Sequence, residues 1–284
     1  MHVVKSQAVP LAVVITFLIL VPATYYMGLV KKAQAAPLVI LVAFSLFVYI
    51  TYYISKRGKD WYIRPIEALT IIDEGIGRAA EMGKPVLTTP GMGGLSGAVT
   101  LAGLSITGEV IQRTAELGVR SVNITDSAQT MMVLEAIVRN AYSTAGRSDL
   151  YQPGRYVQWT GGEQFAYATY MMGSILTEKP ATIIFVGSFL SDIMMSAETG
   201  KRVGAIEIGG TLDTTALSTM AMICDSILVG EEIYAAAAVI TKDKQLSGSV
   251  AGQDWALLVT LVLLVVGMVA SLVGVKDIIN LLKM

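Results

Sequence analysis

The sequence predicts an α/β protein with a Rossmann-like parallel sheet of about six strands, helices on both faces of that sheet, and three transmembrane helices. Short apolar segments alternate with longer helical segments through the middle of the chain, which is typical of a parallel sheet. Long uncharged segments lie on both sides of this region. Hydrophobic residues make up 54% of the 284 residues and charged residues only 15%, against roughly 25% charged residues in ordinary soluble proteins.

Each predicted strand is followed by glycine or a capping residue and then by a helical segment. Pro65 suits the first position of a helix that runs to about residue 82. The segment 182–186, which is apolar after Thr182, is typical of a strand buried on both faces. Such repeated β-then-α steps predict right-handed crossovers within one domain. The predicted strands cover residues 86–89, 121–125, 156–159, 182–186, 205–208 and 226–229.

Three uncharged segments are each long enough to cross about 30 Å of hydrocarbon as a helix. Spans at about 8–30 and 33–55 predict a transmembrane hairpin within residues 1–58, and a third span lies within residues 255–284. Basic residues cluster directly after the second span, and such clusters favour the cytoplasmic side. We therefore expect a multi-pass protein of the cell membrane, with the lipid bilayer as a partner and a cytoplasmic domain at 59–254.

The residue inventory excludes several classes of function. The chain has one histidine, His2, and one cysteine, Cys224, so a Ser-His-Asp triad, a Cys/His zinc site and an internal disulfide are excluded in the body of the chain. The formal net charge of −1 argues against nucleic acid as a partner. No cofactor is indicated by these counts.

A glycine-rich loop is the first candidate ligand site. Gly91, Gly93, Gly94 and Gly97 lie between the first predicted strand and a helix, and Asp126 follows the second strand. This layout is typical of a dinucleotide site, where backbone amides bind a pyrophosphate and an acid binds the ribose hydroxyls. The spacing departs from G-x-G-x-x-G because the third glycine is one residue late, and no P-loop lysine follows. The alternative is that these glycines only form a tight turn and allow close packing.

Four carboxylates form a second candidate site, for Mg²⁺ or Ca²⁺. Glu207 lies within the fifth predicted strand and Asp213 follows that strand, while Glu231 and Glu232 follow the sixth. Carboxylate oxygens are suitable ligands for these cations, and Asp and Glu alone can support a metal-dependent enzyme. The alternative is helix capping, because acidic residues stabilise the first turn of a helix.

The low charge of the central region favours self-association. Residues 60–254 contain 13 Lys and Arg against 21 Asp and Glu, a net charge of −8, and pairs of methionine recur in its helical segments. The leading hypothesis is a non-catalytic, membrane-anchored protein that self-assembles through its α/β domain into a homo-oligomeric ring or scaffold. The alternatives are a nucleotide- or anion-sensing membrane regulator and a metal-dependent enzyme that uses carboxylates.

Residues 224–238 resemble a segment from a family of uncharacterised bacterial and archaeal integral membrane proteins. Ala-Glu-Thr-Gly at 197–200 and the segment 248–254 are similar to neighbouring motifs of the same family. The resemblance covers most of residues 60–260. Because the family is a domain of unknown function, the resemblance implies a membrane location and a prokaryotic source, but no activity and no catalytic residues.

Overall fold

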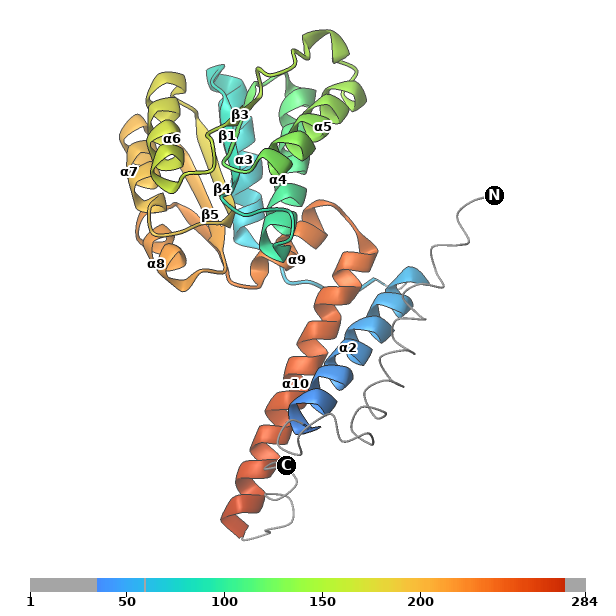
Figure 1. The fold of residues 1–284 in the computed structure, drawn as a ribbon. Helices are drawn as coiled ribbons and strands as arrows, with labels where there is room; N and C mark the ends of the chain where they lie inside the picture. Colours follow the sequence, from blue (N-terminus) through green and yellow to red (C-terminus); the bar gives the residue numbers. More distant parts are fainter. Residues whose placement is uncertain (1–34, 59, 274–284) are drawn as a thin grey trace. The chain divides into compact units, whose positions relative to one another are not determined.

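The structure is a computed structural model that describes residues 35–58 and 60–273. These residues divide into two compact units, which are described separately (Figure 1). The described part of the helical unit consists of 35–58, 60–62 and 244–273, and the α/β domain consists of 63–243.

The helical unit contains two long helices, α2 (Ala35–Lys56) and α10 (Lys244–Val273), which pack against each other. Glycines of α10 make this contact close: a Cβ atom on Gly252 would lie 2.3 Å from Thr51 Oγ1, and one on Gly248 would lie 2.5 Å from Ser55 Cβ. Tyr52 also donates a hydrogen bond to the Gln245 side chain at 2.9 Å. Small residues therefore set the distance between the two helices.

The prediction of transmembrane helices is wrong for the part of the chain that the structure describes. No helix within that part combines the length and the apolar character that crossing a membrane requires. The helix α10 begins at Lys244 rather than near residue 255, and its first three turns contain Gln245, Gln253 and Asp254. The first predicted span, 8–30, lies outside the described residues.

The α/β domain is built on a six-stranded sheet with the order β3-β2-β1-β4-β5-β6, and every neighbouring pair of strands is parallel. The Rossmann-like part of the predicted fold class is therefore confirmed. The strands are β1 (Val86–Gly91), β2 (Ser121–Thr125), β3 (Val157–Trp159), β4 (Thr182–Ser188), β5 (Ile206–Thr211) and β6 (Ser226–Val229).

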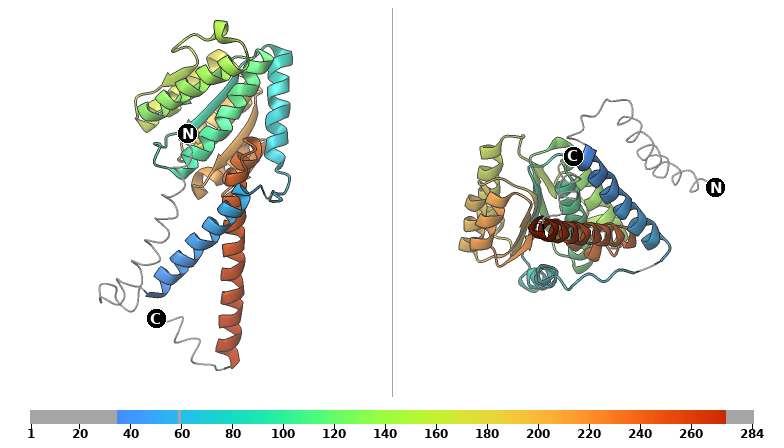
Figure 2. Two further views of the ribbon diagram at one scale, coloured as in Figure 1. Left: turned by 90° about the vertical axis from the view of Figure 1, so that its right-hand side faces the viewer. Right: turned by 90° about the horizontal axis from the view of Figure 1, so that it is seen from below.

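Helices cover both faces of this sheet, as Figure 2 shows from two further directions. One layer contains α6 (Gln164–Glu178), α7 (Ile193–Val203) and α8 (Thr214–Ile223). The other layer contains α3 (Glu67–Met82), α4 (Ala98–Leu117), α5 (Ala128–Thr144) and α9 (Glu232–Ile240). A short 3₁₀ turn, η3 (Ser148–Leu150), precedes β3.

Alternate residues of the strands supply the two cores between sheet and helices. Ile184 and Ile208 face the core shared with α3, α4 and α9. Leu87, Ile183 and Phe185 face the core shared with α6, α7 and α8. The central strands are thus buried on both faces, which explains why their sequences are apolar runs rather than alternating patterns.

Local capping residues fix where the helices begin and end. Ser127 and Asp213 cap α5 and α8 by accepting hydrogen bonds from the backbone N–H groups of Thr130 and Ala216. Gly118, with φ of 74°, closes α4 in the left-handed conformation that glycine adopts without strain. These signals define the positions of the loops at the carboxyl edge of the sheet.

Candidate ligand site at the carboxyl edge of the sheet

The strand order reverses between β1 and β4, which are neighbours in the centre of the sheet. The chain leaves β1 through α4 toward β2 on one side, and it leaves β4 through α7 toward β5 on the other side. Ligands of open α/β sheets bind in the crevice outside the carboxyl ends of the strands at such a switch point. The glycine-rich loop 92–97 directly follows the carboxyl end of β1 and therefore lies at this position.

Gly91 and Gly93 allow this loop to pass very close to the end of β4. Gly91 has φ of 79°, and a Cβ atom on it would lie 2.0 Å from the carbonyl oxygen of Ser188. The N–H of Met92 donates to that same oxygen at 2.8 Å. A Cβ atom on Gly93 would lie 1.9 Å from Thr100 Oγ1. The turn and close-packing interpretation is thus correct for these two glycines, and it is compatible with ligand binding by the same backbone.

The late third glycine of the motif has a structural substitute. In a dinucleotide site the third glycine allows the helix to pack closely on the strand. Here Gly103 lies in α4, and a Cβ atom on it would lie 2.2 Å from the carbonyl oxygen of Val186 in β4. The close contact between helix and sheet is therefore made about two turns later than in the usual fingerprint.

Gly94 and Gly97 leave the amino terminus of α4 open. A Cβ atom on Gly94 would meet nothing within 4 Å, and Gly97 is the N-cap of α4 with no capping side chain. The N–H groups of the first helical turn have no partner within a helix, and they carry partial positive charge. Thr100, which is only 1% exposed, directs its hydroxyl toward Gly93, and that oxygen has no hydrogen-bond partner among the described residues.

Asp126 lies at the carboxyl end of β2 and carries an unused acceptor. Its Oδ1 atom is buried and has no hydrogen-bond partner within the described chain. Burial raises the pKa of this carboxyl group, because the charged form loses its hydration. The α5 helix that follows is tied to the glycine-rich loop, since the Thr130 hydroxyl donates to the carbonyl oxygen of Gly93 at 3.3 Å. The loop and the end of β2 therefore belong to one neighbourhood.

Sequence reasoning missed a polar group that lies below this edge. The hydroxyls of Thr89 in β1 and Tyr167 in α6 are hydrogen-bonded at 2.7 Å in the core. Burial raises the pKa of Tyr167, and the negative charges of Asp126 and Asp192 raise it further. Gln164 donates to Asp192 at 3.0 Å. These residues come from β1, α6 and the start of α7, which are far apart in the sequence, so no local sequence signal identifies them as a group.

The four predicted metal ligands are not brought together. Asp213 caps α8, and the Glu232 carboxylate accepts the N–H of Val229 and forms an ion pair with Arg64. Glu231 precedes α9 as its N-cap without a capping hydrogen bond from its side chain. Across residues 35–58 and 60–273, no three His, Cys, Asp or Glu side chains are close enough to hold a metal ion. The capping alternative describes Asp213 correctly.

Glu207 is the fourth of these residues, and its environment is unusual. It is 0% exposed in β5, and neither carboxylate oxygen has a hydrogen-bond partner in the described structure. A Cβ atom on Gly200 of α7 would lie 1.9 Å from Glu207 Oε1, so only glycine leaves room for this side chain. Burial raises the pKa of Glu207 from 4.5 to about 8, although nearby Lys201 opposes the shift. At neutral pH the carboxyl group is therefore protonated and uncharged.

Acidic residues dominate the six loops that directly follow the strands. These loops contain no Lys or Arg, and their acidic residues are Asp126, Glu163, Asp192, Asp213 and Glu231. An anionic ligand at this edge would thus be held by backbone N–H groups and by the dipole of α4, without help from basic side chains of these loops.

Comparison with known proteins gives one match. No curated protein and no solved structure is significantly similar to the chain. A family model described as "Domain of unknown function (DUF6754)" matches residues 26–282. The match confirms the resemblance to a family of unknown function, and it bears neither on a membrane location nor on a bacterial or archaeal source. The chain belongs to the DUF6754 family.

Proposed function

We propose that the α/β domain binds a nucleotide at the carboxyl edge of its sheet, between the loop 92–97 and the end of β2. The observation that carries this proposal is the buried, unpartnered Oδ1 atom of Asp126. It lies at the position where a carboxylate binds ribose hydroxyls in sheets of this strand order. A ribose hydroxyl is a donor that would satisfy this oxygen.

The amino terminus of α4 supplies the second half of the site. Its first-turn N–H groups have no capping side chain, and Gly94 leaves open space above the loop. A phosphate group fits such a terminus, because it accepts hydrogen bonds from these donors and interacts favourably with the helix dipole. The Thr100 hydroxyl and the backbone of the loop add further polar groups on the same side of the sheet.

The charges of the edge restrict the kind of nucleotide. Five acidic residues and no basic residue lie in the loops that follow the strands. A triphosphate would carry more negative charge than the backbone donors of one helix terminus can offset, and the loop lacks the lysine with which a P-loop holds the outer phosphates. We therefore expect a dinucleotide or a nucleoside monophosphate to bind better than a nucleoside triphosphate.

The test is ligand-induced thermal stabilisation of the full chain by NAD⁺, AMP and ATP. We expect NAD⁺ or AMP to raise the melting temperature more than ATP does. Asp126→Asn keeps the shape of the side chain but weakens ribose binding, and Gly94→Val fills the open space at the phosphate position. Both variants should lose the ligand-induced shift.

Gly77→Val is the matched control, because a Cβ atom on Gly77 in α3 would also meet nothing within 4 Å. This variant should keep the full ligand-induced shift. The proposal is refuted if none of the three nucleotides stabilises the wild-type chain, or if Asp126→Asn and Gly94→Val respond as the wild type does.

Self-assembly through the α/β domain, which the sequence led us to expect, is a second candidate function. A specific observation favours it: the outer surface of α6 and α8 carries almost no charge, since the two helices contain one charged residue between them. The third expectation, a metal-dependent enzyme, finds no support in the described carboxylates, which do not converge.

A further inference from the structure

In the layer formed by α6, α7 and α8, the helices α6 and α8 have few charges, whereas α7 contains Glu198, Lys201 and Arg202. The sequences of α6 and α8 contain a single charged residue, Glu178, at the last position of α6. That carboxylate is already paired with Arg120. The exposed side chains of α6 include Phe165, which is 76% exposed, and Leu176, which is 53% exposed, while Met222 of α8 is 75% exposed.

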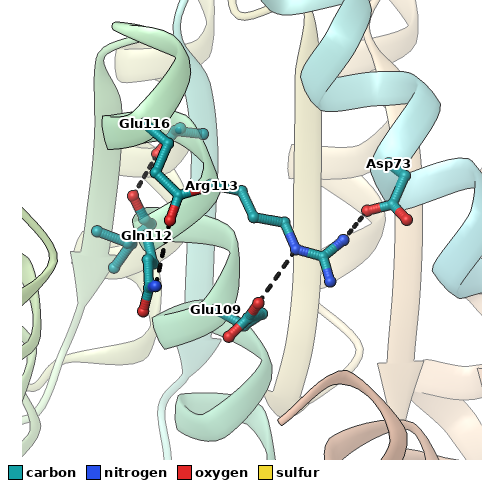
Figure 3. Close-up of polar contacts among 7 residues, drawn as sticks. Asp73, Glu109, Gln112, Arg113 and Glu116 are labelled. Atoms are coloured by element: carbon teal, nitrogen blue, oxygen red, sulfur yellow. Dashed lines mark hydrogen bonds and ion pairs between the residues drawn. The ribbon is translucent and has the colours of Figure 1, made fainter. Parts of the chain in front are cut away.

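In the opposite layer, α3 and α4 carry the charged residues that are usual for solvated helices. Figure 3 shows Arg113 of α4 between Asp73 of α3 and Glu109 one turn away, and it forms ion pairs with both. Gln112 donates to Glu116 on the same helix at 3.2 Å. The α3 sequence alone contains five charged residues. The lack of charge on α6 and α8 is therefore not a general property of the domain.

We propose that the outer surface of α6 and α8 is an interface between two copies of the chain, in which α6 packs antiparallel against α6 of the second copy. The acidic balance of the domain supports a second copy as the occupant. With 21 acidic and 13 basic residues in 60–254, two copies repel each other through most orientations. Contact through α6 and α8, which contain one charged residue between them, adds little local repulsion to this.

The exposed stripe of α6 is complementary to itself. Residues 165, 169, 172 and 176 lie on one side of a helix with 3.6 residues per turn. When two such helices run antiparallel about a two-fold axis near residue 170, Phe165 meets Leu176 of the second copy, and Thr169 meets its Met172. Each pair then occurs twice, as an isologous contact requires. Gly173 has open space around its Cα, so the helix backbones can approach closely.

The apolar area is sufficient for a stable contact. Large apolar side chains on the three helices are between 44% and 76% exposed: Phe165, Tyr170, Leu176, Met194, Met195 and Met222. At about 200 Å² per side chain, these fractions correspond to roughly 690 Å² per copy. A standard interface buries about 800 Å² per partner, including its polar rim. The charges of α7, which lies between α6 and α8, are neutralised locally, because Glu198 pairs with Arg202 and Lys201 pairs with Asp225.

The test measures the particle mass of the full chain by light scattering coupled to size exclusion. The wild type should form a dimer or a larger even-numbered particle. Phe165→Lys and Leu176→Glu, each alone, place a charge against an apolar side chain of the second copy. Each variant should raise the dissociation constant of the particle at least tenfold.

The double variant Phe165→Lys/Leu176→Glu distinguishes the proposed pairing from general damage. In the antiparallel arrangement each new lysine meets a new glutamate of the second copy, so the double variant should associate again and should dissociate in high salt. Met132→Glu is the matched control, because Met132 is 67% exposed on α5 in the opposite layer, and it should leave the mass unchanged.

Three results would overturn the proposal: a monomeric wild type, association that is insensitive to both single variants, or a double variant that stays dissociated although its circular dichroism is unchanged. Nucleotide-induced stabilisation measured on the same variants is independent of these results, because the ligand site lies at the carboxyl edge rather than on the outer face of α6.

Discussion

Replacement of Glu207 by glutamine should remove a large pH dependence from the stability of the α/β domain. The unfolded chain has a Glu207 pKa of 4.5, whereas burial raises it to about 8 in the folded protein. The folded state therefore binds this proton more tightly than the unfolded state does. Below pH 4.5 both states hold the proton, and the full contribution to stability is present. Between pH 4.5 and 8 only the unfolded state releases it, so the free energy of unfolding falls.

The magnitude follows from the size of the pKa difference. One pKa unit corresponds to about 1.4 kcal/mol, so the fall reaches about 5 kcal/mol at pH 8. Domains of this size have free energies of unfolding of about 5–15 kcal/mol, so the loss is a large fraction of the total. Glutamine keeps the shape of the side chain but does not titrate. The free energy of unfolding of the variant should therefore change little between pH 5 and pH 8.5, whereas that of the wild type should fall by several kcal/mol.

The assay is urea unfolding of the full chain at several pH values from 5 to 9, followed by tryptophan fluorescence. Glu198→Gln is the control, because Glu198 is exposed on α7 and its ion pair with Arg202 spans one helical turn. Such a pair contributes about 0.5 kcal/mol or less, so this control should keep the steep pH dependence. Equal slopes of stability against pH for the wild type and Glu207→Gln would refute the reasoning.

Three further predictions concern packing, capping and thiol reactivity. Gly103→Ala should lower the free energy of unfolding by about 2 kcal/mol, because its Cβ atom would lie 2.2 Å from a carbonyl oxygen of β4. Gly108→Ala on the same helix meets its nearest atom at 3.4 Å and should stabilise the domain by up to about 1 kcal/mol. Urea unfolding of both variants checks this, and equal effects would contradict it. Asp213→Ala should cost about 1 kcal/mol through loss of the α8 cap, with the same loss in Mg²⁺ and in EDTA; a loss seen only in Mg²⁺ would restore the metal interpretation. Burial raises the pKa of the Cys224 thiol to about 12. Alkylation of this thiol by iodoacetamide at pH 8 should therefore be at least tenfold slower in the folded chain than in the urea-unfolded chain. Equal rates would show that the thiol is accessible as thiolate in the folded chain.

The sheet of the α/β domain was predictable because its signals are local. The buried strands are short apolar runs, and each is followed by glycine or by a cap such as Ser127 or Asp213. The observed β1, β4 and β5 extend by two or three residues beyond the predicted ends. In each case the added residues include glycine or a residue with a hydroxyl group. A prediction based on apolar residues ends the strand before them.

The contacts between distant segments were not predictable from these patterns. Thr89 meets Tyr167 across 78 positions in the chain, and only the folded sheet brings β1 and α6 together. Glu207 was interpreted as a metal ligand because carboxylates near strand ends suggest coordination, but its register in β5 turns the side chain into the core instead. The long apolar segments were interpreted as transmembrane, whereas no helix in the described part of the chain meets that requirement, and α10 begins eleven residues before the predicted span.

The contact between the glycine-rich loop and the end of β4 has a consequence for the thermodynamics of binding. Because Met92 is hydrogen-bonded to Ser188 and Thr130 to Gly93, the backbone donors of this loop are already in place before any ligand arrives. Binding then requires little ordering of the chain, so a weak ligand loses less of its interaction energy to conformational entropy than it would at a mobile loop. The same rigidity limits how far the loop can adapt, so selectivity among ligands depends on the shape of a preorganised surface rather than on closure around the ligand.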